Sequence, residues 1–237
     1  MLLRMITKGL VVAMAQYENF NRIDLEGTIV SEIDFSHQIF DERFFLFTLS
    51  VQRRSDHKDD VQVTVSNKLL SETSLAKGMK ISVEGQLRSY NKQEEKRNRL
   101  ILMVFARSIS KAEGQTKDPN QIQLEGYICK QPIYRKTPFG REITDLLVAV
   151  NRAYKKSDYI PVIAWGRNAQ TAKHLMVGDK IKIEGRFQSR DYQKCFGPNQ
   201  TEVCTAYEVS ANRLERLDKY EIVGAEVDCD EGMSSLA

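Results

Sequence analysis

The feature that most constrains this chain is an internal repeat with a period of about a hundred residues. Three blocks recur in the same order: 23–27 at 122–126 and 48–53 at 147–152, both at an offset of 99, and 78–85 at 178–185, at an offset of 100. Three ordered matches at a nearly constant offset are hard to obtain by chance. The sequence therefore predicts a tandem duplication of one module.

Each copy carries the same order of secondary-structure signals, namely β-prone segments, one short stretch that suits a helix, and turns that contain Gly. In the first copy, strands are expected at 23–30, 44–51, 61–65, 80–90 and 99–109, with a helix within 66–76 and a charged hairpin loop at 91–98. In the second copy, 159–165, 168–176 and 180–185 repeat the strand, the helix and the following strand.

Five strands with a helix between the third and the fourth are the layout of the OB-fold, a small Greek-key barrel that binds oligonucleotides. The fold class is therefore expected to be all-β, with two tandem OB-folds. Gly27 lies inside the first expected strand. A strand that bends sharply to pair on both sides of a small barrel favours glycine at the bend.

The repeat also predicts how the chain is divided. The expected parts are an N-terminal extension at 1–20, a first OB-fold at 21–110, a linker at 111–120, a second OB-fold at 121–217 and an acidic disordered tail at 218–237. The apolar run within 10–15 is too short for a secretory signal or a membrane span. Met14 is favoured over Met1 as the natural start, because it stands just before the first module.

Charge is distributed unevenly along the chain. Residues 116–217 carry 17 basic and 11 acidic residues, a net charge of +6, and residues 218–237 carry one basic and six acidic residues, a net charge of −5. A basic module suggests a polyanionic partner, and a solvated surface with an accidental excess of cations is the alternative.

Cysteine and histidine spacing favours neither a metal site nor an enzyme. The four Cys form no C-x-x-C pair, and the three His are scattered. No Ser-His-Asp spacing and no Gly-rich phosphate loop is present, so no cofactor is expected. Two reduced cysteines are favoured over a Cys195–Cys204 pair that faces across a hairpin.

The second copy contains an ordered set of short motifs. They are Gly126 with Pro132 six residues later, Arg135, a turn at Gly140, Val148-Ala-Val-Asn-Arg152, Val162-Ile-Ala-Trp-Gly-Arg167 and the block 178–185, followed by Phe187 and Tyr192. Together they span most of 121–217, which resembles the bacterial single-stranded DNA-binding protein (SSB) family. The resemblance implies a non-enzymatic protein of replication, recombination or repair.

In that family, aromatic side chains at four positions stack on bases. The resemblance places them at Tyr154, Tyr159, Trp165 and Tyr192. Stacking accepts every base and contributes roughly 1–3 kcal/mol per base. Cations that suit phosphates lie near these positions or in the first loop: Arg135, Arg152, Lys155, Lys156, Arg167, Arg190 and Lys194. Core packing is the alternative for each aromatic residue.

The first copy departs from this pattern. Opposite the four aromatic positions it has Ser55, Asp60, Ser66 and Lys92. It is therefore expected to be chiefly structural or dimer-forming. A weaker contact with nucleic acid is expected from Arg53, Arg54, Arg88, Tyr90 and Lys92.

The expected partner is single-stranded DNA, bound without strong sequence preference, in the cytoplasm with the nucleoid and with no membrane partner. Family members commonly assemble four OB modules, so two modules per chain imply a homodimer. In the family, an acidic tail recruits replication and repair proteins. Here the tail is shorter and lacks the Pro-Phe ending, so a solvating role is favoured.

Two other functions stay open. One is a primosome-like protein-interaction and assembly factor built on OB-folds, which the weak first copy favours. The other is an RNA-binding protein, because a stacking surface accepts either nucleic acid.

Overall fold

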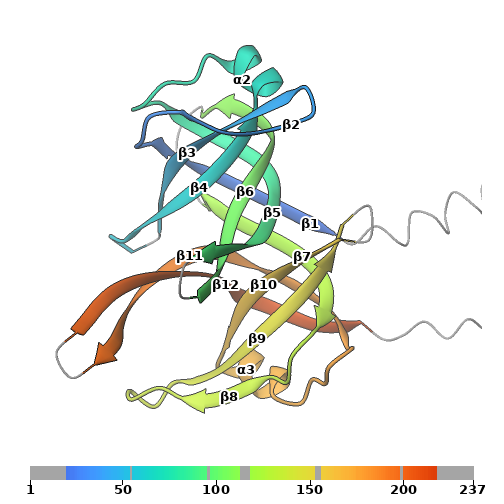
Figure 1. Cartoon of the computed structure of the whole chain (residues 1–237). Coiled ribbons are helices and arrows are strands. Elements are labelled where there is room, and N and C mark those ends of the chain that lie inside the picture. The colour runs from blue at the N-terminus through green and yellow to red at the C-terminus, as the bar shows by residue number, and fades with distance from the viewer. Residues whose placement is uncertain are drawn as a thin grey trace, which may run out of the picture.

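The computed structural model describes residues 20–53, 55–94, 97–112, 118–152, 156–197 and 200–217, with backbone alone at 94, 97–98, 194–197 and 200–202. The expected N-terminal extension up to residue 19, the acidic tail at 218–237 and residues 113–117 of the expected linker lie outside these ranges. Figure 1 shows the described chain as two β-barrels, one above the other.

The first barrel is built from six strands and one helix. They are β1 (Asn21–Ile29), β2 (Asp34–Ile39), β3 (Glu42–Gln52), β4 (Lys58–Ser66), α2 (Asn67–Thr73), β5 (Lys80–Glu94) and β6 (Arg97–Lys111). The second barrel repeats this order with β7 (Asn120–Ile128), β8 (Ile133–Lys136), β9 (Glu142–Asn151), β10 (Ser157–Trp165), α3 (Arg167–Ala172), β11 (Lys180–Gly197) and β12 (Gln200–Leu217).

Both barrels close in the same way, and this confirms the prediction of two tandem OB-folds. In the first barrel, β1 pairs antiparallel with β3 and with β5, and β4 runs parallel to β6. In the second, β7 pairs with β9 and β11, and β10 runs parallel to β12. Helix α2 falls within the segment 66–76 that the sequence predicts to be helical. Helix α3 overlaps the predicted segment 168–176 but begins one residue earlier and ends at Ala172.

The strands β2 and β8 were not predicted. All six residues of β2 are exposed, so the segment has no buried face and no alternation of apolar and polar residues. In the described structure, β2 pairs with β3 and β8 pairs with β9. The two strands therefore lie at opposite ends of the sheet. Each turns the first loop of its barrel into a hairpin.

The long hairpins β5–β6 and β11–β12 also differ from expectation. The predicted loop at 91–98 is wrong, since β5 and β6 stay paired as far as Glu94 and Arg97. The described residues 90–93 are exposed, because the hairpin extends beyond its barrel. The less favoured alternative, in which Cys195 and Cys204 face each other across a hairpin, is not found, because Cys204 lies opposite Tyr192, Cys195 lies opposite Thr201 and the Cys204 thiol is free.

Glycine is required where the first strand of each barrel bends. A Cβ on Gly126 would lie 2.6 Å from the carbonyl oxygen of Ala149 and 2.7 Å from Cγ1 of Val148. A Cβ on Gly27 would lie 2.5 Å from the carbonyl oxygen of Ser50. The bent strand therefore approaches its neighbour too closely for any side chain.

Replacing Gly126 by alanine is expected to lower the free energy of unfolding by about 1–3 kcal/mol, as overpacking in a closed core does. Gly140 provides the control, because its Cβ would meet nothing within 4 Å, although its φ of +75° favours glycine in its own right. Urea unfolding of the two alanine variants measures the difference. An unchanged free energy of unfolding in Gly126→Ala would show that the close approach at Gly126 does not restrict the position.

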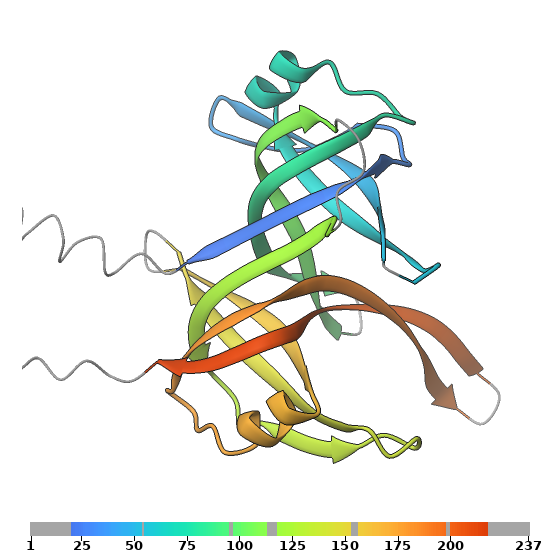
Figure 2. The same ribbon diagram turned by 180° about the vertical axis from the view of Figure 1, so that it is seen from behind.

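One antiparallel pairing joins the two barrels. β1 pairs with β7 from Asn21 opposite Leu124 to Leu25 opposite Asn120, so a single sheet of twelve strands runs through the molecule. Figure 2 shows these two strands side by side, β1 in blue and β7 in yellow-green. The two cores meet at this pairing, where Ile23 lies opposite Ile122 and both are buried.

A matched pair of asparagines stabilises this seam. The Asn21 side chain donates to the Leu87 carbonyl at 2.8 Å and accepts from the Leu87 amide at 2.9 Å. Asn120 makes the same two bonds with Phe187, at 2.6 and 2.8 Å. The duplication has therefore kept the polar contacts of the seam as well as its strands.

The helices of the structure are short. In the described part of the chain, none is long and apolar enough to cross a membrane.

The buried apolar residues of both barrels form one cluster, whose largest fully buried side chains include Phe47 and Phe187.

Candidate nucleic-acid interface

The outer face of the second barrel carries two of the expected stacking residues. Tyr159 and Trp165 stand six positions apart on β10, so their side chains lie on the same side of the sheet. Tyr159 is 45% exposed and Trp165 is half-buried opposite Ile143 on β9. Both rings are therefore placed where a base could reach them.

Cations surround this face. Arg135 of β8 lies opposite Ile143 and donates to Asp145 at 2.7 Å, and this hydrogen bond raises the pKa of its guanidinium. Arg167 at the start of α3 and Lys156 before β10 are exposed. Arg190 is half-exposed, 3.7 Å from the Glu208 carboxylate. The predicted residues Arg54, Tyr154 and Lys155 and the side chain of Lys194 lie outside the described residues.

Tyr192 lies away from Trp165, on the hairpin β11–β12. Its ring is 39% exposed and lines a cleft of about 470 Å³ between the two barrels. The cleft is also lined by Pro161 on the outer face of the second barrel and by Gln62 and Arg99 of the first barrel. The predicted stacking residues Tyr159, Trp165 and Tyr192 therefore extend from the outer face of the second barrel to the cleft beside the first barrel.

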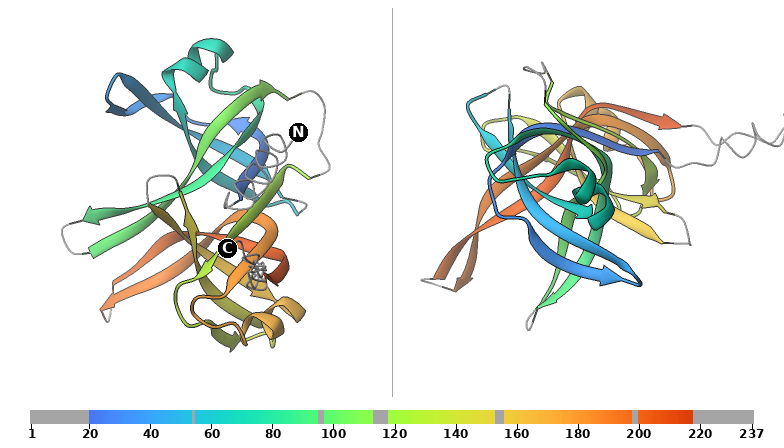
Figure 3. Two further views of the ribbon diagram at one scale, coloured as in Figure 1. Left: turned by 90° about the vertical axis from the view of Figure 1, so that its right-hand side faces the viewer. Right: turned by 90° about the horizontal axis from the view of Figure 1, so that it is seen from above.

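The two long hairpins extend from the same side of the molecule, as the left view of Figure 3 shows. Each hairpin contacts the other barrel. Ser189 on β11 reaches Asp59 on β4, and Ser89 on β5 reaches Asp158 on β10. The hydrogen bonds made by the two hairpins therefore hold the barrels against each other.

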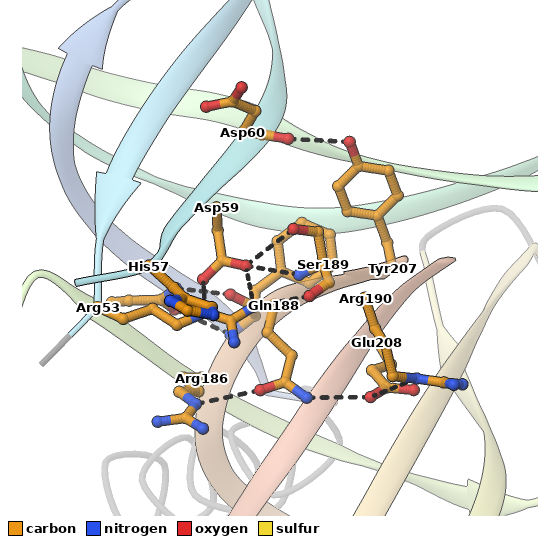
Figure 4. A network of polar contacts seen from close by, with 12 residues as sticks. Arg53, His57, Asp59, Asp60, Arg186, Gln188, Ser189, Arg190, Tyr207 and Glu208 are labelled. Atoms are coloured by element: carbon orange, nitrogen blue, oxygen red, sulfur yellow. Dashed lines mark hydrogen bonds and ion pairs between the residues drawn. The ribbon is translucent and has the colours of Figure 1, made fainter. Parts of the chain in front are cut away.

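Figure 4 shows the first of these contacts. Asp59 accepts hydrogen bonds from the Ser189 amide at 2.7 Å and from the Ser189 hydroxyl at 3.0 Å. Arg53 donates to both Asp59 oxygens and to the Ser189 carbonyl at 2.6 Å. Burial of the Asp59 carboxyl acts to raise its pKa, but the bonds from Arg53 and Ser189 outweigh it, so the pKa is lowered.

The second contact mirrors the first. Asp158, fully buried, accepts from the Ser89 amide at 2.6 Å and pairs with Arg152 at 2.8 Å and with Arg88 at 3.2 Å. The Tyr159 amide donates to the Ser89 hydroxyl at 2.7 Å. This contact between β5 and β10 therefore fixes the backbone at Tyr159, a predicted stacking residue.

These contacts change the reading of three predicted cations. Arg53, Arg88 and Arg152 were expected to meet phosphates, and the structure places all three against buried carboxylates. The contacts between each long hairpin and the other barrel were not predicted. Asp59 and Asp158 are 99 positions apart and Ser89 and Ser189 are 100 apart, so extending the repeat comparison to polar residues could have found it.

Tyr207 was also missed. Its hydroxyl donates to the Asp60 carbonyl at 2.9 Å across the cleft, and its ring stacks on Phe187. Burial raises the pKa of the Tyr207 phenol. The remaining predicted residues of the first barrel, Tyr90 and Lys92, are exposed on β5.

The arrangement offers surfaces for binding. Among the described residues, no group of three or more His, Cys, Asp or Glu could hold a metal ion. The face offers aromatic rings, cations and a cleft, which together suit a polyanion with flat bases.

Comparisons with known proteins agree with this chemistry. Residues 119–217 match the family described as "Single-strand binding protein family". A "Single-stranded DNA-binding protein 2" of Streptococcus agalactiae is 35% identical over 106 residues, which cover 42% of this chain and 77% of that protein. A "Single-stranded DNA-binding protein" of Clostridium tetani is 37% identical over 81 residues, which cover 31% of this chain and 56% of that protein.

A solved structure is similar across both barrels. The crystal structure of the wild-type single-stranded DNA binding protein from Thermus aquaticus has a TM-score of 0.68 at 25% identity. The match covers 85% of this chain and 95% of that one. The two-barrel arrangement therefore occurs in a solved structure as well as in this chain.

Proposed function

Because the chain belongs to the single-strand binding protein family, we propose that it binds single-stranded DNA without strong sequence preference and acts in DNA replication, recombination or repair. Binding requires no catalytic group and no cofactor. A protein with this activity works where the DNA is, so the proposed location is the cytoplasm, in association with the nucleoid.

The observation that carries the proposal is the shared face of Tyr159 and Trp165. Two rings on one side of β10, flanked by Arg135, Arg167 and Lys156, provide stacking surfaces and phosphate partners together. A single strand presents unpaired base faces and phosphates together, whereas duplex DNA hides its base faces. We include Tyr192 in the path, because the cleft begins next to Pro161 on the same face.

We further propose the division of labour between the modules at 21–110 and 121–217. The second module supplies the stacking face, and the first supports it through the hairpin β5–β6. Two chains would assemble four modules, so a homodimer is the proposed state in solution. Sedimentation of the full chain measures this state directly.

The single Trp allows a direct test of the function. We expect oligo-dT to quench Trp165 fluorescence, with an affinity that falls steeply as salt rises, because each neutralised phosphate releases counterions. Duplex DNA of the same length is the control and is expected to quench weakly. Stronger quenching by RNA would point to RNA binding, and no response to any strand would contradict the proposal in favour of a protein-assembly role.

A further inference from the structure

The twelve-stranded sheet has two free ends, β2 in the first barrel and β8 in the second. Among the described strands, β2 pairs with β3 alone and β8 pairs with β9 alone, so the other edge of each is uncovered. Figure 1 shows β2 in the upper part of the molecule and β8 at its lower end. An uncovered edge presents backbone N–H and C=O groups with which a strand of another chain can pair.

The two free ends carry opposite charge. Segment 34–42, which contains β2 and its turn, has a net charge of −3 from three acidic residues: Asp34, Asp41 and Glu42. The matching segment 133–141, at an offset of 99, has a net charge of +3 from three basic residues: Arg135, Lys136 and Arg141. All six charged side chains are exposed. The two copies of the module therefore have the same hairpin with charges of opposite sign.

Most of these charges are available to a partner. Within the described part of the chain, Asp34, Asp41, Glu42 and Arg141 have no ion-pair partner. The Lys136 ammonium is 64% exposed and lies 3.7 Å from the nearest carboxylate, a distance at which it can still meet another anion. Arg135 alone has a close partner, at 2.7 Å. The acidic end is therefore uncompensated, and the basic end is compensated only in part.

The single sign of charge at each end decides how two copies can meet. A β2 edge against a second β2 edge would bring carboxylates together, and a β8 edge against a second β8 edge would bring cations together. Like charges that face each other across a strand pair destabilise it, and opposite charges stabilise it. Charge complementarity between surfaces also selects the correct partner. The favoured pairing is therefore the β2 edge of one copy with the β8 edge of another.

Both edges are already formed in the single chain. The Phe35 ring of β2 packs edge-on against Phe45 of β3, with centroids 6.1 Å apart. The Tyr134 hydroxyl of β8 donates to the Glu142 carboxylate of β9 at 2.7 Å. Phe35 and Ile133 are more than half exposed, so each edge also offers an apolar side chain to a partner. A strand that is fixed beforehand loses less conformational freedom on binding.

We propose that copies of this chain associate head to tail, with the acidic β2 edge of one copy against the basic β8 edge of the next, when they lie side by side on one DNA strand. The partner is a second copy of this chain. The inference goes beyond the proposed function, on which it rests for the strand that gathers the copies. A contact between two different surfaces leaves one edge free at each end of a row, so the row can grow.

The contact is small, because β8 has only four residues. A small contact is weak between molecules that diffuse freely. Copies bound to one strand have a high effective concentration, at which even a weak contact is populated. The proposed homodimer would use another face, because like edges repel each other. The row would then consist of homodimers in contact through their free edges.

The test compares oligo-dT of about 10 nucleotides with poly-dT of about 300. At about 4–16 nucleotides per OB-fold, the short strand cannot hold two chains and the long strand holds several. Trp165 quenching on the short strand measures the binding of one copy. On the long strand at sub-saturating protein, clustered copies leave fully covered strands beside free ones, and sedimentation resolves the two. The quenching isotherm of the long strand then gives the association constant between neighbours.

Two double variants reverse the charge of one end each. Asp41→Lys with Glu42→Arg makes both ends basic, and Lys136→Glu with Arg141→Glu makes both ends acidic. We expect each variant alone to lower the association constant between neighbours by about 2- to 30-fold, the range for two exposed ion pairs. The first double variant should bind the short strand as tightly as the unaltered protein does, because its substitutions lie in the first barrel.

Mixing the two variants provides the decisive measurement. In an equimolar mixture each variant finds a complementary edge on the other, so clustering on poly-dT should return. Asp56→Lys with Glu72→Arg is the matched control, since it changes the net charge as the first double variant does, at exposed positions outside segment 34–42. This control should cluster normally. Raising the salt should weaken clustering of the unaltered protein, because the charges at the edges are exposed.

The outcomes distinguish this inference from the proposed function. If the unaltered protein binds both strands but does not cluster, or if both variants cluster normally, only this inference is overturned. A mixture that stays unclustered, or a variant that loses the homodimer, also overturns it. If the unaltered protein binds neither strand, the proposed function fails. Sedimentation of the free protein at low salt then decides on the contact, because the mixture should sediment faster than either variant alone. Thermal unfolding confirms that each variant is folded.

Discussion

Replacing Trp165 by alanine is expected to weaken binding of oligo-dT by about 5- to 150-fold, the equivalent of one base that loses its stacking partner. The ring stands on the outer face of β10, half-buried beside Ile143, so part of its surface is free to meet a base. Since the variant has no Trp, anisotropy of a dye-labelled strand replaces intrinsic fluorescence as the measurement.

Two variants control this result. Trp165→Phe keeps a ring and should recover most of the affinity, because stacking needs a π-face and no particular hydrogen bond. Phe40→Ala removes an exposed ring at the turn between β2 and β3 of the first barrel, and should leave binding unchanged. Urea unfolding of Trp165→Ala corrects for lost packing against Ile143. Unchanged affinity in a folded Trp165→Ala protein would contradict the stacking role of this face.

The fold was predictable because the sequence contains two copies of the same module. Buried faces alternate along β4 and β10 in both copies, and Gly27 and Gly126 mark the bends that close the barrels. The parts that were missed lack a buried face. β2 is exposed along its whole length, and the far end of the hairpin β5–β6 extends beyond its barrel. Periodicity reports burial, so paired but solvated strands leave no such signal.

The candidate site was predictable only where one strand defines it. Tyr159 and Trp165 share a face because the side-chain period of a strand is two. Arg53 was read as a phosphate contact from its local charge, but its partners are Asp59 and Ser189, the latter 136 positions away in the chain. Phe44 on β3 contacts the rings of His37 on β2 and Phe105 on β6. Contacts that join several strands leave no pattern along any one of them.

Replacing Asp158 by alanine is expected to destabilise the protein by about 3–5 kcal/mol, the usual loss when one partner of a buried ion pair is removed. The change leaves the Arg88 and Arg152 guanidinium groups and the Ser89 amide without their shared acceptor. Arg152 already has a buried Nε with no hydrogen-bond partner in the described structure, so little alternative bonding is at hand. Calorimetry should show the unfolding midpoint lower by roughly 6–20 °C.

Asp24→Ala is the matched control, because Asp24 pairs with Arg22 on the surface, where such pairs contribute roughly 0–1 kcal/mol. The position of Asp158 adds a second expectation. Asp158 accepts from the backbone amide of Ser89, and the Ser89 hydroxyl accepts from the Tyr159 amide, so strand binding should weaken in the folded variant too. A midpoint as little changed as that of Asp24→Ala would show that the contact of hairpin β5–β6 with the second barrel has no measurable part in stability. That contact would then serve only to position the binding face.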